Sequence, residues 1–98
     1  MNENQVLNKA IDVLARELNP GKILLFGSRA KGKNSKNAGF DIAVDVVKPD
    51  ITKEREIAEK IDEIAGLYCV DIVYLYSVEN DFRKIIMKTG KVVYERGN

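Results

Sequence analysis

Apolar residues recur along the chain with two periods, one typical of helices and the other of strands. Steps of three and four residues predict helices over residues 5–18 and 53–66, and a shorter helix over 80–88. An unbroken apolar run predicts a buried strand over 22–26. Strict alternation of apolar and polar residues predicts a second strand over 40–46.

The second half of the chain adds two more strands, predicted over 70–76 and 92–94. Together with a short helical turn that could form over residues 28–32, helices and strands therefore alternate along the 98 residues. Such alternation is typical of an α/β layer architecture, and the length predicts a single domain over residues 1–98.

The sequence also predicts which residues cap the helices and which residues of the third helix point inward. Asn4 is expected to cap the first helix and Thr52 the second, since both side chains can accept hydrogen bonds from free backbone N–H groups. In the third helix, the pattern predicts that Phe82, Ile85 and Ile86 point inward.

The amino-acid composition limits which general bases, metal ligands and disulfides the protein can use. Without histidine the chain lacks the commonest general base and the commonest zinc ligand, so a metal would be a hard cation held by carboxylates. The single cysteine, Cys69, forms no internal disulfide and is expected to be a small buried residue. No apolar run is long enough to span a membrane, so we expect a cytoplasmic protein without a membrane partner.

Charge is unevenly distributed, although the net charge is only +1. Between residues 18 and 40 there is no acid, and there are five cations, which are Lys22, Arg29, Lys31, Lys33 and Lys36. No aromatic residue is interleaved with the last four cations, so direct binding to nucleic acid is not favoured. Cations followed by carboxylates suit a metal-bound polyphosphate instead.

Two aspartates stand near the starts of apolar strands. Asp41 and Asp71 could converge on one cation if their strands are neighbours; the alternative is that each faces solvent on the open side of the sheet. Asp45 lies on the same face as Asp41 but about 13 Å further along the strand, too far to share a metal. We therefore expect Asp45 to be an exposed surface residue.

A glycine–serine pair follows the first strand. Gly27 would let a ligand approach the backbone, and the hydroxyl and N–H of Ser28 could hold phosphate oxygens. The alternative is an ordinary turn in which Ser28 caps a short helix over 28–32. Arg29 and Lys31 could neutralise phosphate charge, or belong to a solvated loop.

These elements together resemble a known family. Gly27-Ser28, the ten residues 29–38, and then Gly39-Phe40-Asp41 resemble the Gly-Ser, ten-residue gap and Asp-x-Asp of the minimal nucleotidyltransferases in the DNA polymerase beta superfamily. Asp71 in VDIV matches the third family aspartate, and GSRAKG, DIAV and the ending IIMKTGKVVYER resemble further family segments. The resemblance covers nearly the whole chain and implies a small mixed sheet of about four strands with helices packed on one face.

One position departs from the family pattern. The resemblance implies three carboxylates that hold two Mg²⁺ ions, but Gly39 occupies the position of the first. Asp41 and Asp71 then remain as the metal and catalytic residues, and both metal binding and turnover are expected to be weakened. Activity gained by introducing a carboxylate at position 39 would show that the rest of the site is intact.

The resemblance also implies a reaction and a partner. It implies transfer of a nucleoside monophosphate, AMP from the substrate ATP, to a hydroxyl of a protein. That protein would be a HEPN-domain toxin, with this chain as its neutralising antitoxin. Asp71 would help to activate the acceptor, while Gly27 and Ser28 would hold the β- and γ-phosphates with help from Arg29 and Lys31. The alternative is a catalytically inactive module that docks on such a toxin or self-associates as a homodimer.

Overall fold

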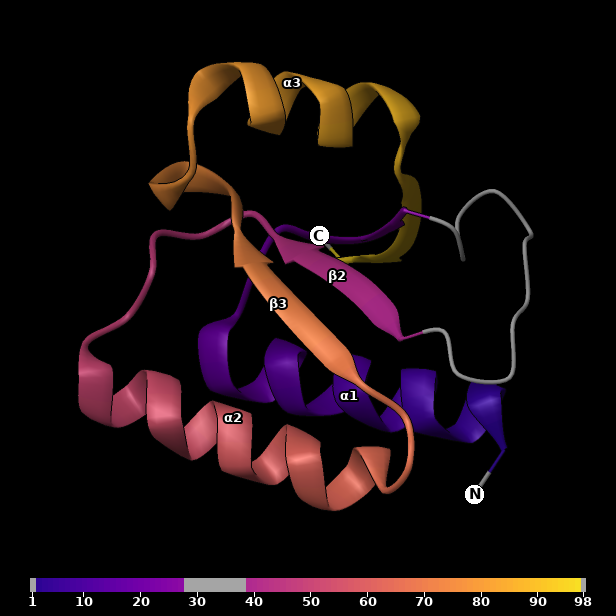
Figure 1. Cartoon of the computed structure of the whole chain (residues 1–98). Coiled ribbons are helices and arrows are strands. Elements are labelled where there is room, and N and C mark those ends of the chain that lie inside the picture. Colours follow the sequence, from indigo (N-terminus) through magenta and orange to yellow (C-terminus); the bar gives the residue numbers. More distant parts are fainter. Residues whose placement is uncertain (1, 28–38, 98) are drawn as a thin grey trace.

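Four short strands form one mixed sheet in the computed structural model, which describes residues 2–27 and 39–97 (Figure 1). The order across the sheet is β3–β2–β1–β4. β1 runs antiparallel to both β2 and β4, whereas β2 and β3 are parallel. The strands are β1 Lys22–Phe26, β2 Phe40–Val44, β3 Val70–Tyr74 and β4 Lys91–Glu95.

Helices cover both faces of this sheet. The long helices α1 (Glu3–Leu18) and α2 (Ile51–Ala65) lie side by side on one face, and the short α3 (Asn80–Thr89) lies on the other (Figure 1). The predicted α/β class with a small mixed sheet is confirmed. The expectation that the helices pack on one face is correct for α1 and α2 but wrong for α3, because Leu24 and Ala43 turn apolar side chains to the opposite face, where Ile86 of α3 covers them. None of the helices in the described residues is long and apolar enough to cross a membrane.

The hydrophobic core is divided by the sheet into two clusters. The larger cluster lies between the sheet and α1 with α2, where the fully buried residues include Leu14, Ile23, Ile42 and Ile57. The smaller cluster lies under α3 and consists of Leu24, Ala43, Leu75 and Ile86. Successive strand residues point to opposite faces, so β1 and β2 contribute to both clusters.

Both long helices begin earlier than predicted. Asn2, not Asn4, caps α1: its side chain accepts the Gln5 N–H at 2.9 Å, and the Gln5 side chain accepts the Asn2 N–H at 3.0 Å. Asp50, not Thr52, caps α2 by accepting the Lys53 N–H at 2.8 Å. In each case a side chain further upstream satisfies the free N–H groups, which extends the helix towards the N-terminus.

Helix α3 buries less than its pattern predicts. Ile86 is buried against Leu24, but Phe82 is 41% exposed and Ile85 is 59% exposed. The helix is only ten residues long and lies mainly over β1, and Ile86 is its one buried residue in the described part of the chain. Phe82 keeps one edge-on contact with the ring of Phe26, with ring centroids 6.1 Å apart.

β2 and β3 also end two residues sooner than predicted. β3 turns into a 3₁₀ helix, η1, over Leu75–Ser77, which ends the strand. Two hydrogen bonds join η1 to the segment after β2. The Tyr76 N–H donates to the Val46 carbonyl at 3.3 Å, and the Lys48 N–H donates to Ser77 Oγ at 2.8 Å.

Candidate functional site

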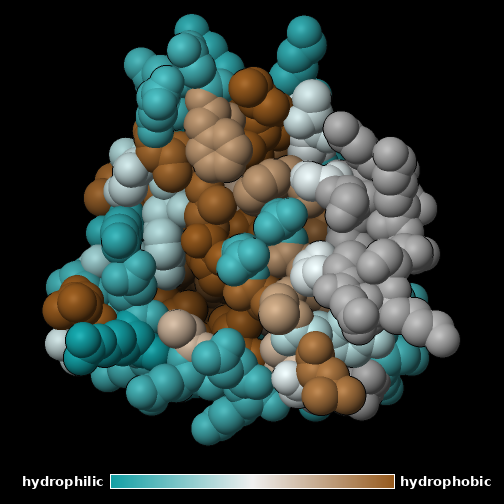
Figure 2. All heavy atoms as spheres, viewed as in Figure 1, coloured by the Kyte–Doolittle hydropathy of each residue, from teal (hydrophilic) through white to brown (hydrophobic). Residues whose placement is uncertain are grey.

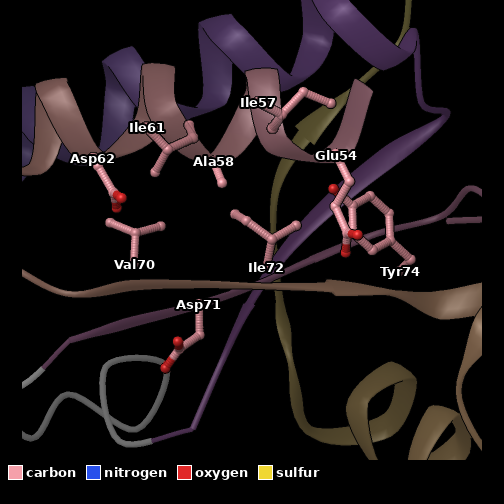
Figure 3. A pocket seen from close by; sticks show the side chains of 9 residues that line it. All are labelled: Glu54, Ile57, Ala58, Ile61, Asp62, Val70, Asp71, Ile72 and Tyr74. Carbon is pink, nitrogen blue, oxygen red and sulfur yellow. The ribbon is translucent and has the colours of Figure 1, made fainter. Parts of the chain in front are cut away.

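Asp41 and Asp71 occupy matching positions on neighbouring strands. β2 and β3 are parallel, and their register places the two residues directly opposite each other. Neighbouring strands lie about 4.8 Å apart, which brings the two carboxylates to one place on the sheet. Both point to the α3 side, since Asp41 alternates with the buried Ile42 and Asp71 points away from α2 (Figure 3).

The electrostatics of the pair favour a bound cation. Asp41 is half-buried and Asp71 is exposed. Burial, and secondly the Asp71 carboxylate opposite, raise the pKa of Asp41 above its usual value. A cation placed between the two carboxylates would remove this repulsion and replace the water that Asp41 has lost.

Gly27 stands beside this pair at the end of β1. Phe26 lies opposite Asp41 in the antiparallel register, so the next residue is next to the carboxylate. Gly27 has a φ of +74°, and a Cβ there would lie 2.5 Å from Asp41 Oδ2. Glycine is therefore required both by the backbone angle and by the space that the Asp41 carboxylate fills. The other predicted phosphate ligands, Ser28, Arg29 and Lys31, fall outside the described residues.

Gly39 is packed against the backbone of the connection before β3. A Cβ at position 39 would lie 2.6 Å from the Cys69 carbonyl oxygen and 3.1 Å from Cys69 Cβ. The same carbonyl accepts the Phe40 N–H at 2.7 Å, the contact that precedes the β2–β3 pairing. A side chain at position 39 would therefore displace backbone, and a carboxylate added there does not simply complete the site.

The residues present fit one hard cation better than two. No group of three potential metal-ligating side chains occurs in the described part of the chain. Asp41 and Asp71 alone cannot supply the three carboxylates that a pair of Mg²⁺ ions would take in this arrangement. A single Mg²⁺ is commonly held by one or two carboxylates together with substrate phosphates and water. Asp41 and Asp71 can provide these two carboxylates.

Two expectations about neighbouring residues are corrected by the structure. Asp45 is partly buried, not free on the surface: its Oδ1 accepts the Lys22 N–H at 2.9 Å and so joins the ends of β1 and β2 furthest from Asp41. Cys69 is exposed, because it lies in the connection between α2 and β3, which the core does not cover.

Comparison with known proteins decides the family. A family model described as Polymerase beta, Nucleotidyltransferase matches residues 8–98. The chain belongs to the polymerase beta nucleotidyltransferase family. No curated protein matches this nucleotidyltransferase chain significantly.

Solved structures agree with this assignment. A chain from a crystal structure of a toxin–antitoxin with AMP-PNP is 30% identical, with a TM-score of 0.76, over 91% of this chain and 73% of that chain. A chain from the toxin–antitoxin MntA-HpeT with two aspartate-to-glutamate substitutions is 26% identical, with a TM-score of 0.72, over 98% and 75%. A tyrosine-to-alanine variant of MntA-HpeT gives 28%, a TM-score of 0.71, and coverage of 98% and 74%.

Two features of this candidate site have no signal in the sequence. Gly39 and Cys69 lie just before β2 and just before β3, and nothing in either local pattern indicates that they pack together. The role of Asp45 is similar, because its partner is a backbone N–H on β1 and not a side chain that could be recognised by type.

Proposed function

We propose that this protein transfers AMP from ATP to a hydroxyl group of a partner protein. The observation that supports this proposal is the register of β2 and β3, which places Asp41 directly opposite Asp71. Gly27 lies in close contact with the Asp41 carboxylate. Membership of the nucleotidyltransferase family supports the reaction class, and a similar toxin–antitoxin crystallised with AMP-PNP supports an adenine nucleotide as the ligand.

In the proposed reaction, the acceptor oxygen forms a bond to the α-phosphorus of ATP. The bond between that phosphorus and the oxygen that bridges to the β-phosphate breaks, and pyrophosphate leaves. The acceptor hydroxyl loses its proton to Asp71, which is exposed and acts as the general base. A bound Mg²⁺ would supply neutralisation of the charge on the phosphate oxygens, with Asp41 and Asp71 as its protein ligands.

The phosphates are proposed to extend from Asp41 towards the segment that follows β1. Gly27 leaves room for the backbone to approach them, and Ser28, Arg29 and Lys31 would donate to or neutralise the β- and γ-phosphate oxygens. This assignment is supported by the place of Gly27 next to Asp41.

The proposed partner is a toxin with a HEPN domain, which AMP transfer would neutralise. Three similar solved structures come from toxin–antitoxin complexes, which supports a toxin as the partner. We propose that the reaction takes place in the cytoplasm, where ATP is available and where an exposed free thiol such as Cys69 stays reduced.

Calorimetric titration of Mg–ATP tests the nucleotide site without knowledge of the acceptor. The unchanged chain is expected to bind, and Asp41→Ala is expected to weaken binding by about tenfold or more, because a charged ligand is lost. Asp12→Ala is the matched control, since Asp12 is an exposed aspartate on α1, outside the site. Absence of Mg–ATP binding to the unchanged chain would contradict the proposal.

A second function is favoured by one observation. Glycine at position 39, packed against Cys69, leaves two carboxylates where the family pattern has three, which would suit a module that docks on its toxin without transferring AMP. In that case the complex with the toxin would keep its affinity in both Asp41→Ala and Asp71→Ala, and no AMP would appear on the toxin. Loss of AMP transfer in these variants would instead support the enzyme.

A further inference from the structure

A groove separates α2 from the outer strand of the sheet. Its volume is about 180 Å³. Isoleucine and alanine side chains from α2 face valine and isoleucine side chains from β3 across it (Figure 3). Figure 2 shows hydrophobic side chains gathered along the middle of this face, over β3, with hydrophilic side chains around them. The apolar lining consists of Ile57, Ala58, Ile61, Val70 and Ile72.

β3 forms one wall of the groove and is also an edge strand. It stands at the end of the sheet order, and its outer side pairs with no other strand in residues 2–27 and 39–97. The backbone N–H and C=O groups on such an edge are a template for an added strand. The groove and the edge together fit an extended segment better than a helix, because the segment can continue the sheet while its side chains enter the groove.

The two faces of β3 differ in their chemistry. Val70 and Ile72 point towards α2, whereas Asp71 between them points to the opposite face, where Asp41 lies (Figure 3). An added strand would alternate in the same way, and residues paired across two strands share a face. A residue paired with Asp71 would therefore lie beside that carboxylate, while its two neighbours would enter the apolar groove.

The charge of the groove indicates what flanks such a segment. Asp62 lies at the Val70 end and Glu54 at the Tyr74 end, and no lysine or arginine among the described residues lines the groove (Figure 3). Glu54 is already paired with Lys48, but the distance is 3.4 Å and both side chains are substantially exposed, so this pair is weak. Carboxylates at both ends complement a segment with a cation at either end.

We propose that β3 binds an extended segment of a partner protein in which a hydroxyl residue stands between two apolar residues, with cations on either side. The apolar pair would occupy the groove, and the hydroxyl residue would be held beside Asp71 on the nucleotide side of the sheet. The role of that hydroxyl as AMP acceptor rests on the function proposed above. The docking itself rests on the groove and the free edge.

A synthetic peptide with the order lysine, alanine, valine, threonine, valine, alanine, lysine tests this inference. The order is the same in both directions, so parallel and antiparallel docking give the same pairing. We expect the peptide to shift the amide NMR signals of Val70–Tyr74 and the α2 residues of the groove. Replacing both valines by serine is expected to weaken binding by about tenfold, since the apolar contacts are lost.

Two substitutions on α2 form a matched pair for the charge argument. Asp62→Lys and Glu63→Lys make the same change of charge at adjacent exposed positions, but only Asp62 lines the groove. Asp62→Lys is expected to weaken peptide binding about three- to tenfold, while Glu63→Lys has little effect. Equal effects of the two substitutions, or NMR shifts outside β3 and α2, would overturn the docking proposal.

A second peptide separates docking from catalysis. Valine has nearly the shape of threonine, so a peptide with central valine is expected to dock as well, but with Mg–ATP only the threonine peptide should gain AMP. If both peptides dock at β3 and neither gains AMP, the docking surface is supported and the enzymatic function is not. If Mg–ATP binds at Asp41 and neither peptide shifts β3, this inference is overturned and the nucleotide site stands.

Discussion

Adding a carboxylate at position 39 is expected to destabilise the protein and not to strengthen the proposed metal site. The new Cβ would lie 2.6 Å from the Cys69 carbonyl oxygen, which is closer than such atoms can approach. Either the chain at Gly39 or the chain at Cys69 must move. The hydrogen bond from the Phe40 N–H to that carbonyl, now 2.7 Å, would then lengthen or break at the start of the β2–β3 pairing.

The size of this effect can be worked from its parts. Forcing an extra carbon into a packed position costs about 1–3 kcal/mol, and weakening one backbone hydrogen bond costs about 1 kcal/mol. Glycine-to-alanine changes gain about 0.4–1 kcal/mol through the unfolded chain where the backbone angle permits, and Gly39 has no positive φ. We therefore expect Gly39→Ala to lower the free energy of unfolding by about 2 kcal/mol, and the melting temperature by about 10 °C. Gly39→Asp should cost more, because it adds a like charge near Asp41.

Urea denaturation followed by circular dichroism measures these differences, with Gly97→Ala as the matched control. Position 97 has open space around its would-be Cβ, so this control should change the free energy of unfolding very little. Titration of Mg–ATP into Gly39→Asp completes the experiment, and we expect no gain in affinity. If Gly39→Ala is as stable as the unchanged protein, a Cβ at position 39 does not clash with the Cys69 carbonyl. A stable Gly39→Asp that binds Mg–ATP more tightly would contradict the clash even more strongly.

Three further predictions concern charge and backbone angle. Asp71→Asn should lower the pKa of Asp41, which carbon NMR of the Asp41 carboxyl group would measure. It should also raise the free energy of unfolding at pH values above the pKa of Asp41, where the ionised Asp41 carboxylate now opposes folding. An unchanged pKa of Asp41 would contradict this. Hydrogen bonds from lysines, chiefly from Lys60, lower the pKa of Glu17 below 4.5. The ion pair of Glu17 therefore stabilises the folded protein above pH 4.5, and this stabilisation is lost as the pH falls through the lowered pKa. Urea denaturation of Glu17→Gln and the unchanged protein should therefore differ at pH 7 and converge in acid, whereas a constant difference would argue against the ion pair. Gly27→Ala should cost about 1–2 kcal/mol for its φ of +74° and also weaken Mg–ATP binding by displacing the Asp41 carboxylate, so a variant with normal affinity would show that this contact is unimportant.

The local pattern of apolar residues was sufficient to predict which segments form helices and strands. The hydrophobic period of each segment depends on local geometry, and every helix and strand predicted within residues 2–27 and 39–97 is present within a few residues of its expected place. The short helix considered for residues 28–32 lies outside the described residues. The ends were less predictable, because Asn2 and Asp50 compete with equally suitable capping residues nearby, and only the packed helix shows which one is used. Likewise, the pattern of α3 could not show that Phe82 and Ile85 remain exposed, because their burial depends on how the helix lies on the sheet.

The two aspartates could be recognised from their positions in apolar strands, but their arrangement could not. Asp41 and Asp71 are thirty positions apart, and whether they meet depends on which strands are neighbours and in what register, which is a property of the assembled sheet. Only the folded structure shows that Gly27 packs against Asp41 and Gly39 against Cys69, because a glycine has no side chain from which a contact could be predicted. It also left β3 at the edge beside an apolar groove, since an unpaired edge is defined by what the rest of the chain does not cover.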